Sequence, residues 1–364
     1  MTQEEKAGGI LYVSCGSGGE RILANAYINF KNLRPAKNCF YAINTSKKDH
    51  ERVTSLFKKE RVGQYKNFKM TLVGEEELHG FGAGKDYTFG LKAYKSSRAE
   101  ILDDLEKLHK QYKFKIAFTV ATLGGGCGTM TLGEVSKDIR EHLGLRVTPV
   151  CSIPFRREGE LLIGNALTGL NHISAMGLNP LIFDNERMMM FSDSVKEGVE
   201  KANTIISRLL SSLVDLVEFG GFATPPIDIV DITRLIMPQC GLFSVAFSDN
   251  PKDFKKNWKN YLEFSKSVDS KPIERTNAFV MFKARAFPHS LTEEVLSYLR
   301  NSYKTKEIIP TTMEEDRFAG FTVLVIIWGL SISEIHPRLK AKEFFKEKVS
   351  FWSKSIFKPL KKLR

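Results

Sequence analysis

Residues 119–130 read TVATLGGGCGTM, with four glycines among the five residues 124–128. The apolar residues 116–120 predict a buried strand before the glycines, and the amphipathic residues 132–143 predict a helix after them. Glycines let backbone N–H groups approach an anion, and a helix N-terminus adds partial positive charge. The stretch therefore predicts a phosphate cradle to which Thr129 adds a hydroxyl donor. The alternative is a tight strand-to-helix turn that binds nothing.

Length and composition are those of a globular protein with room for two domains. The chain has 364 residues, of which 42% are hydrophobic and 26% are charged. The five cysteines (Cys15, Cys39, Cys127, Cys151 and Cys240) form no CxxC pair, which is typical of free thiols in a reducing compartment such as the cytosol. The N-terminus lacks an apolar signal-peptide core, and the longest apolar run, residues 323–328, is too short to span a bilayer.

Positive charge is concentrated at the C-terminus. The net charge is +12, and residues 340–364 hold nine basic and two acidic residues, which leaves about +5 for the rest of the chain. A charge of that size argues against a general nucleic-acid surface on the body of the protein.

Further polar and glycine-rich segments follow predicted strands in the first half of the chain. They are the segment 15–21 (CGSGGER), Asn44 and Thr45 after the strand 39–43, the loop 78–85 (LHGFGAGK), and the polar residues after the strands 146–153 and 181–183. Strands that alternate with helices predict a parallel sheet with helices on both faces. The segment after the first strand fails the GxGxxG spacing, because Arg21 stands where the third glycine belongs, so a dinucleotide-dependent oxidoreductase is disfavoured.

A long helical pattern over residues 193–217 divides the chain. At 1.5 Å per residue it would be about 37 Å long, which suits a spine between two domains. Asp228 and Asp231 follow it after a Pro–Pro corner and are the best general acid or base candidates, with a helix cap and first-turn acid as the alternative. Strands at 241–248, 276–286 and 320–329 and helices at 251–267 and 291–301 predict a smaller α+β domain.

The last segment has the pattern of an amphipathic helix. Phe345, Val349, Trp352 and Ile356 share one helical face, and Lys358 is one of the lysines that cover much of the remaining surface. A basic helix with aromatic residues on one side predicts binding to an anionic membrane surface. The alternatives are a helix packed on the body of the protein or one that docks on a partner.

The order of these motifs, over about residues 8–330, resembles the tubulin/FtsZ superfamily, and AINT (residues 42–45) followed by GAG (82–84) is closer to FtsZ and the archaeal CetZ-like proteins than to eukaryotic tubulin. The resemblance implies an α/β fold with a Rossmann-like GTP-binding domain (1–191), a central helix (192–219) and a smaller α+β activation domain (220–335). The amphipathic membrane-binding tail (336–364) would follow. Departures from the family pattern are Ser17, Glu20, Cys127, Met130, Leu162 and Pro226.

The resemblance also implies the site. GTP or GDP, with Mg²⁺ as a candidate companion and no metal site of the protein itself, would bind Gly16, Ser17, Gly18, Gly19, Asn44, Gly82, Ala83, Gly84, Gly124, Gly125, Gly126, Cys127, Gly128, Thr129, Glu158, Asn185 and Asn203. In this set Glu158 would contact the ribose, and the two asparagines Asn185 and Asn203 would read the guanine edge. Asp228 and Asp231 would activate the hydrolytic water in the pocket of the next subunit.

Two function hypotheses follow. The first is a cytoskeletal GTPase that polymerises head to tail, hydrolyses GTP between subunits and attaches filaments to the inner face of the cell membrane in cell division or cell shape. The second is a membrane-associated GTP-binding protein that neither polymerises nor hydrolyses well.

Overall fold

A computed structural model describes residues 8–63, 65–227, 240–269, 276–303 and 305–335. Its strands form one ten-stranded sheet in the order β3-β2-β1-β4-β5-β6-β7-β10-β8-β9. In chain order they are β1 (Ile10–Cys15), β2 (Cys39–Asn44), β3 (Phe68–Leu72), β4 (Ile116–Thr122), β5 (Arg146–Ile153), β6 (Leu181–Asp184), β7 (Cys240–Ser248), β8 (Asn277–Ala284), β9 (Glu307–Glu314) and β10 (Phe321–Leu330).

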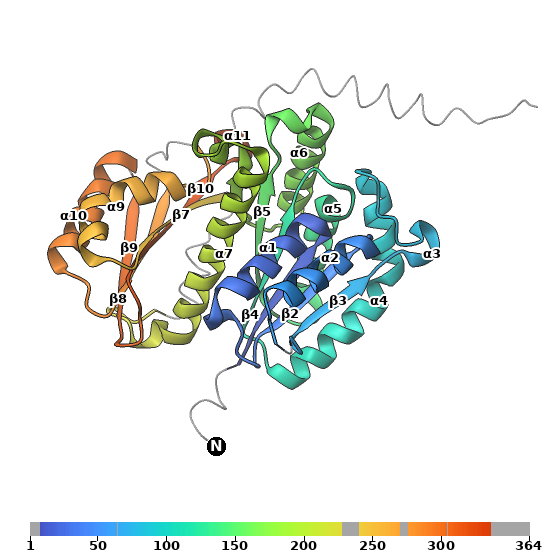
Figure 1. Cartoon of the computed structure of the whole chain (residues 1–364), viewed down its shortest axis with the longest axis horizontal. Helices are drawn as coiled ribbons and strands as arrows, with labels where there is room; N and C mark the ends of the chain where they lie inside the picture. Colours follow the sequence, from blue (N-terminus) through green and yellow to red (C-terminus); the bar gives the residue numbers. More distant parts are fainter. Residues whose placement is uncertain (1–7, 64, 228–239, 270–275, 304, 336–364) are drawn as a thin grey trace, which may run out of the picture.

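Helices cover both faces of the sheet (Figure 1). Buried side chains of α1 (Gly16–Asn29), α2 (Lys47–Lys59) and α7 (Val195–Phe219) pack on one face. Those of α4 (Tyr87–Tyr112), α5 (Gly126–His142), α6 (Glu160–Ala175), α9 (Pro251–Ser265) and α10 (His289–Tyr303) pack on the other. Two short helices, α3 (Glu75–Leu78) and α11 (Ile332–Ile335), complete the α-helices of the described residues.

The sheet changes character halfway across. From β3 to β6 every neighbouring pair is parallel, as the alternation of strands and helices predicts. In the second half β10 is antiparallel to both β7 and β8. The only register pair between β6 and β7 is Leu181 with Gly241, so a single narrow contact joins the two halves into one sheet.

Several sequence expectations need correction. The sequence patterns at 90–97 and 98–112 predict two helices, but the structure has one, α4, and the glycines after β1 form the first turns of α1. Helix α5 likewise begins inside the glycine stretch, at Gly126, and not at residue 132. The elements β3, α2 and β9 were not predicted, because β3 and β9 are partly exposed and α2 buries only Val53 and Phe57.

Helix α7 runs along the sheet from one end of its strands to the other. It starts after β6, where the parallel strands end, and runs back toward the end where they begin, over 25 residues or about 37 Å at 1.5 Å per residue. Ile205, Leu209 and Leu213 on its buried face belong to the core beneath it. The expected helix at 193–217 is therefore present, shifted by two residues.

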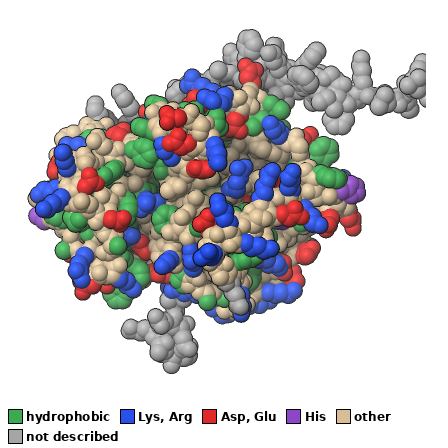
Figure 2. Space-filling view, in the orientation of Figure 1, with side chains coloured by type: hydrophobic (Ala, Val, Ile, Leu, Met, Phe, Trp, Pro, Cys, Tyr) green, Lys and Arg blue, Asp and Glu red, His purple; other side chains and the backbone are tan. Residues whose placement is uncertain are grey.

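Lys and Arg side chains are interspersed with Asp and Glu over the face in Figure 2. Within the part of the chain that the structure describes, no helix has the length and apolar character needed to cross a bilayer.

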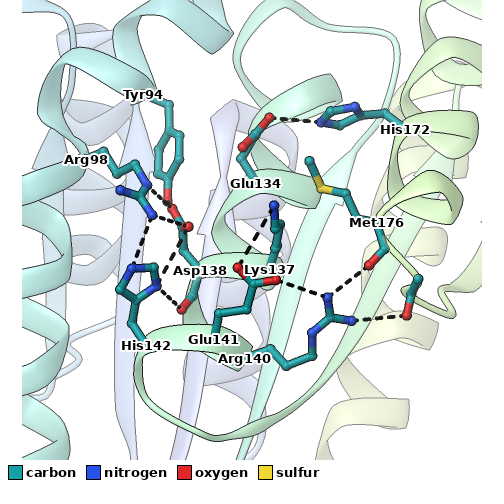
Figure 3. Close-up of polar contacts among 11 residues, drawn as sticks. Tyr94, Arg98, Glu134, Lys137, Asp138, Arg140, Glu141, His142, His172 and Met176 are labelled. Atoms are coloured by element: carbon teal, nitrogen blue, oxygen red, sulfur yellow. Dashed lines mark hydrogen bonds and ion pairs between the residues drawn. The ribbon is translucent and has the colours of Figure 1, made fainter.

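A buried carboxylate fixes α5 against α4 (Figure 3). Asp138 of α5 accepts hydrogen bonds from the Tyr94 hydroxyl at 2.6 Å and from two nitrogens of Arg98, both at 2.7 Å. On the other side of α5, Glu134 pairs with His172 of α6 at 3.2 Å, and Arg140 donates to the carbonyl of Met176 at 3.0 Å. Since α5 begins in the glycine stretch, this network also holds that stretch in place.

We expect Asp138→Ala to lower the free energy of unfolding by about 2 kcal/mol, because it leaves the buried Tyr94 hydroxyl without its acceptor while the half-exposed Arg98 regains water. Denaturant titration measures the loss. Asp103→Ala, which removes an exposed pair with Lys107 on α4, should change the free energy of unfolding far less, because water screens the pair. Equal effects of the two substitutions would contradict this role of Asp138.

Candidate functional site

A cavity of about 330 Å³ lies at the edge where β1, β2 and β4 end. Its wall includes the start of α1 (Gly16, Ser17, Gly18), the end of β2 (Asn44), the loop Gly82, Ala83, Gly84, the start of α5 (Gly125, Gly126, Cys127, Gly128), and Glu158 with Leu162. Segments spread over some 150 positions of sequence thus meet in one place. Most of the residues that the sequence assigns to a nucleotide site are among them.

The walls approach closely because glycine occupies the contacts. A Cβ on Gly128 would lie 2.8 Å from the carbonyl oxygen of Cys15, and one on Gly126 would lie 2.7 Å from Ala83. Behind them, a Cβ on Gly90 of α4 would lie 2.2 Å from the carbonyl oxygen of Gly126. A Cβ on Gly125 would meet no atom within 4 Å, and Gly125 borders the open cavity. Glycine is therefore required for packing at some of these positions and leaves space for a ligand at another.

Two helices begin at the cavity. The N-caps of α1 and α5 are Cys15 and Gly125, and neither end has a side chain that caps it. The first N–H groups of a helix lack partners within it and carry partial positive charge, so two uncapped helix starts favour an anion such as a phosphate chain between them.

Two polar residues of the predicted set, Thr129 and Asn44, hold the loops around the cavity through hydrogen bonds, and only Asn44 also lines the cavity. The Thr129 hydroxyl donates to the Gly125 carbonyl at 2.5 Å and accepts from the Gly124 N–H at 2.9 Å, so it braces the loop. The expectation that Thr129 adds a hydroxyl donor to the phosphate cradle stays a prediction. The Asn44 side chain accepts from the N–H of Thr45 at 2.8 Å and donates to Glu20 at 2.8 Å.

A buried glutamate lies behind the wall. Glu20 has no exposed surface, and its second oxygen lies 2.8 Å from Nδ1 of His50 on α2. Burial alone would lower the pKa of His50, but the hydrogen bond and charge of Glu20 outweigh it, so the pKa of His50 is raised above its ordinary value of 6.5. The sequence showed Glu20 only as a departure from the family pattern, and nothing singled out His50.

Charged groups also occupy the mouth of the cavity. Asp49 accepts a short hydrogen bond from the Ser17 hydroxyl and one of 2.9 Å from Arg52. Burial raises the pKa of Asp49. Its hydrogen bonds with the hydroxyls of Ser17 and Ser46 and the charge of Arg52 lower the pKa by more, so the net shift is downward. Arg21 and Lys85 line the same cavity and supply positive charge.

Asn165 joins two of the loops. From α6 its amide donates to the carbonyls of Lys85, at 2.9 Å, and Gly124, at 3.0 Å. Sequence reasoning missed this residue. A buried asparagine inside an otherwise apolar helix was the available signal, since a buried amide needs partners.

Five residues of the predicted set do not line the cavity: Gly19, Gly124, Thr129, Asn185 and Asn203. A Cβ on Gly19 would lie 2.3 Å from the carbonyl of Val120, which makes it a packing residue. Asn203 is one turn before Ser207, whose hydroxyl bonds to the Ile22 carbonyl of α1 at 3.3 Å. Because the two helices run side by side in the same direction, Asn203 lies next to the first turn of α1, beside the cavity.

The remaining predicted residues differ in how far the structure describes them. Glu158 lines the cavity and accepts from the N–H of Phe155 at 2.9 Å. Asn185 is buried where β6 ends. Asp228 and Asp231 lie outside the described residues, as do the tail residues Phe345, Val349, Trp352, Ile356 and Lys358.

A model of the tubulin/FtsZ family GTPase domain matches residues 9–193, half of the chain. The chain therefore belongs to the tubulin/FtsZ family, and its first half is a GTPase domain of that family. The resemblance seen in the motif order is confirmed, and with it the expectation that the protein is a GTPase that binds GTP and GDP.

Two FtsZ proteins from archaea are similar to most of this chain. Cell division protein FtsZ 1 of Halobacterium salinarum is 23% identical over 282 residues, 75% of this chain and 68% of the relative. FtsZ 1 of Methanocaldococcus jannaschii is 24% identical over 328 residues, 89% of this chain and 79% of the relative. The chain is thus a divergent member of the family that is similar to FtsZ proteins of archaea over most of its length.

Solved structures show the same fold. A GTPγS-bound protofilament of CetZ2 from Haloferax volcanii aligns with a TM-score of 0.72 at 17% identity, covering 95% of this chain and 99% of that one. The FtsZ dimer of M. jannaschii aligns with a TM-score of 0.69 at 20% identity, covering 90% and 89%. The α/β fold class is confirmed over the described residues.

We predict that Asn203→Ala weakens GTP binding by roughly tenfold or more, because a base-reading amide leaves its partner unsatisfied when removed. ATP, which lacks the guanine edge, should bind poorly to the wild type and equally poorly to the variant. Competition against a fluorescent GTP analogue measures both. Asn257→Ala, on the remote helix α9, is the matched control, and equal wild-type affinity for GTP and ATP would contradict the assignment.

We expect the Glu20–His50 pair to make stability depend on pH. A raised pKa in the folded state means that the contribution is full below the unfolded-state pKa of about 6.5 and is lost as pH rises through the folded-state value. Wild type should therefore exceed His50→Gln in stability more at pH 6 than at pH 8.5 in denaturant titrations. A pH-independent difference, or the same behaviour in His289→Gln, would refute this.

Proposed function

We propose that this GTPase assembles head to tail into filaments and hydrolyses GTP at the junction between subunits. The proposal rests on one observation. The nucleotide cavity lies where the parallel strands end, and α7 finishes at the opposite end of the strands (Figure 1). A copy stacked along the direction of α7 would bring the segment after α7 to the cavity of its neighbour. That segment carries Asp228 and Asp231.

Exposed apolar side chains at both edges support stacking. Phe81, in the wall of the cavity, is 88% exposed, and Leu161, beside Leu162 of the wall, is 66% exposed. Phe222, just after α7, is 79% exposed. Such side chains are stabilised when a second surface covers them. Solved relatives support this mode of assembly, since the CetZ2 structure is a protofilament.

The carboxylates of the cavity wall are already engaged in hydrogen bonds, which supports a catalytic acid supplied by a second copy. Asp49 and Glu158 are the acidic residues of its wall among the described residues. Asp49 is bonded to Ser17 and Arg52, and Glu158 to the backbone of Phe155. Phosphoryl transfer needs a group that orients the attacking water. In the proposal Asp228 and Asp231 of the neighbouring subunit provide it, while the helix starts and glycine loops hold the phosphates, with Mg²⁺ as the companion ion.

We further propose that the tail binds an anionic membrane surface. The support is the sequence pattern of residues 336–364, with Phe345, Val349, Trp352 and Ile356 on one face and Lys358 among the surrounding lysines. Each basic residue near such a surface contributes about 1 kcal/mol. Polymerisation would join many tails, so filaments should bind membrane better than single subunits. The proposed partners are further copies of the chain and lipid, not nucleic acid, and the location is the inner face of the cell membrane.

We expect GTP turnover per subunit to rise with protein concentration and to fall at least about tenfold in Asp231→Ala, since the attacking water loses its orienting group. Nucleotide affinity should be unchanged, and Asp103→Ala serves as the control. Asp231→Ala lacks the acid but keeps the cavity, whereas Gly126→Val fills the cavity wall but keeps the acid. Mixing the two variants should restore activity at junctions where the first supplies the cavity and the second supplies the acid. Turnover per subunit that does not change with concentration would favour the non-polymerising alternative.

We expect the full chain to pellet with vesicles of anionic lipid, less so at high salt, and a chain ending at Ile335 to remain in solution. Trp352→Glu should abolish pelleting because it places a charge on the apolar face. Ser350→Glu adds the same charge on the opposite face and should lower pelleting only slightly. Equal loss in both variants would point to charge alone and contradict an amphipathic helix.

A further inference from the structure

A carboxylate with no exposed surface lies behind the wall of the nucleotide cavity. Glu20, near the start of α1, accepts a hydrogen bond of 2.8 Å from the side-chain amide of Asn44, and its other oxygen lies 2.8 Å from Nδ1 of His50. Among the described residues no lysine or arginine forms an ion pair with it. An unneutralised charge is costly in a protein interior, so the protonation state of His50 decides whether this place carries a net negative charge.

The groups around this pair supply no further positive charge to the glutamate. On α2 the negative charge of Asp49 favours a charged imidazole, and Asp49 itself is bonded to the exposed Arg52 at 2.9 Å. From β3 the backbone of Thr71 also favours the charged imidazole. On α5 the thiol of Cys127 is neutral, because burial raises its pKa to about 12 and the charge of the glutamate opposes its ionisation further. The imidazole is therefore the one cation beside this carboxylate among the described groups.

Asn44 connects the pair to the cavity. It ends β2 and lines the cavity wall. Its side-chain oxygen accepts from the N–H of Thr45 at 2.8 Å, and its amide nitrogen donates to Glu20, so both ends of the amide are held. A hydrogen bond to a carboxylate is stronger than one to a neutral acceptor, which fixes the amide firmly. The nitrogen carries a second hydrogen that it can offer to a ligand in the cavity.

We propose that Glu20 and His50 act as positioning residues for nucleotide binding: Glu20 holds Asn44 in the cavity wall, and the nucleotide binds best when His50 carries a proton. The phosphates bring negative charge to a cavity whose wall already feels the glutamate, since the charge of Glu20 acts on Cys127 in that wall. A protonated imidazole cancels the charge of the glutamate and removes this repulsion. The inference concerns a single subunit and does not depend on assembly.

Linkage fixes the direction of the pH dependence. Burial lowers the pKa of His50, but the hydrogen bond and charge of Glu20 raise it by more, so the pKa lies above 6.5. As pH rises through that raised value the imidazole loses its proton, and the repulsion of the phosphates returns. Because coupling between two binding events is reciprocal, the nucleotide must in turn favour the proton. Nucleotide binding should therefore weaken as pH rises and should take up a proton.

The first experiment titrates the full chain with GDP, which is not hydrolysed, by isothermal calorimetry from pH 6 to pH 9, in pairs of buffers with different ionisation enthalpies. The same titration of His50→Gln contains every other ionisation, including that of the phosphates, so the difference between the two proteins isolates the imidazole. We expect His50→Gln to bind GDP roughly tenfold more weakly than wild type at pH 6 and equally well at pH 9. The equality at pH 9 also verifies folding.

Further variants separate the charge of the glutamate from its hydrogen bond. Glu20→Gln combined with His50→Gln removes the buried charge but keeps an acceptor for Asn44, and should recover most of the affinity that His50→Gln loses at pH 6. Glu20→Ala leaves Asn44 without this acceptor and should bind GDP more weakly at every pH. His289→Gln on α10 is the matched control and should behave as wild type.

Three results would each overturn the proposal: the same pH dependence in wild type and His50→Gln, a loss in His50→Gln that is equal at pH 6 and pH 9, or a double variant as weak as His50→Gln. Because the measurement uses GDP and dilute subunits, its failure leaves the proposed assembly and its catalytic acids untouched, and failure of assembly leaves this inference standing.

Discussion

The close approach of two strand-to-helix junctions underlies the rest of the structure. Strands β1 and β4 are neighbours; β1 passes directly into α1, and β4 leads into α5 after the short turn 123–125, at the same end of the sheet. The junctions interlock because Gly128 of one touches the backbone of Cys15 in the other. A side chain at that contact would separate the two helix starts. The phosphate cradle therefore depends on backbone contacts, and the polar side chains around it serve mainly to hold the loops.

Those supporting side chains form a layer behind the cavity. Asn165 joins the loops of Lys85 and Gly124, Thr129 braces its own turn, and Asn44 connects β2 to Glu20. These hydrogen bonds are buried or partly buried, so each also prevents an unsatisfied polar group. The pair of Glu20 and His50 continues this layer to α2.

Helix α7 gives the molecule its direction. It begins at the nucleotide end of the strands, contacts α1 through Ser207 and Asn32 after α1 through Ser211, and ends at the opposite end of the strands. In the second half of the chain the sheet continues through one register pair, Leu181 with Gly241. Helix α7 therefore carries much of the contact between the halves.

The sequence alone determined the fold class, the length of α7 and most of the cavity wall. Hydrophobic periodicity and glycine clusters are local signals, and the order of the motifs gave the family. It did not reveal β3 and β9, which are partly exposed, or α2, which buries few side chains, since such elements leave weak periodic patterns.

Only the tertiary structure decided how individual side chains are used. Thr129 and Gly19 have residue types that suit a phosphate site, yet one braces a loop and the other packs on Val120. His50 and Asn165 gain their environments from residues 30 or more positions away. A sequence pattern records which groups are available, whereas partners, burial and free hydrogen-bonding capacity arise only when distant segments come together in the folded chain.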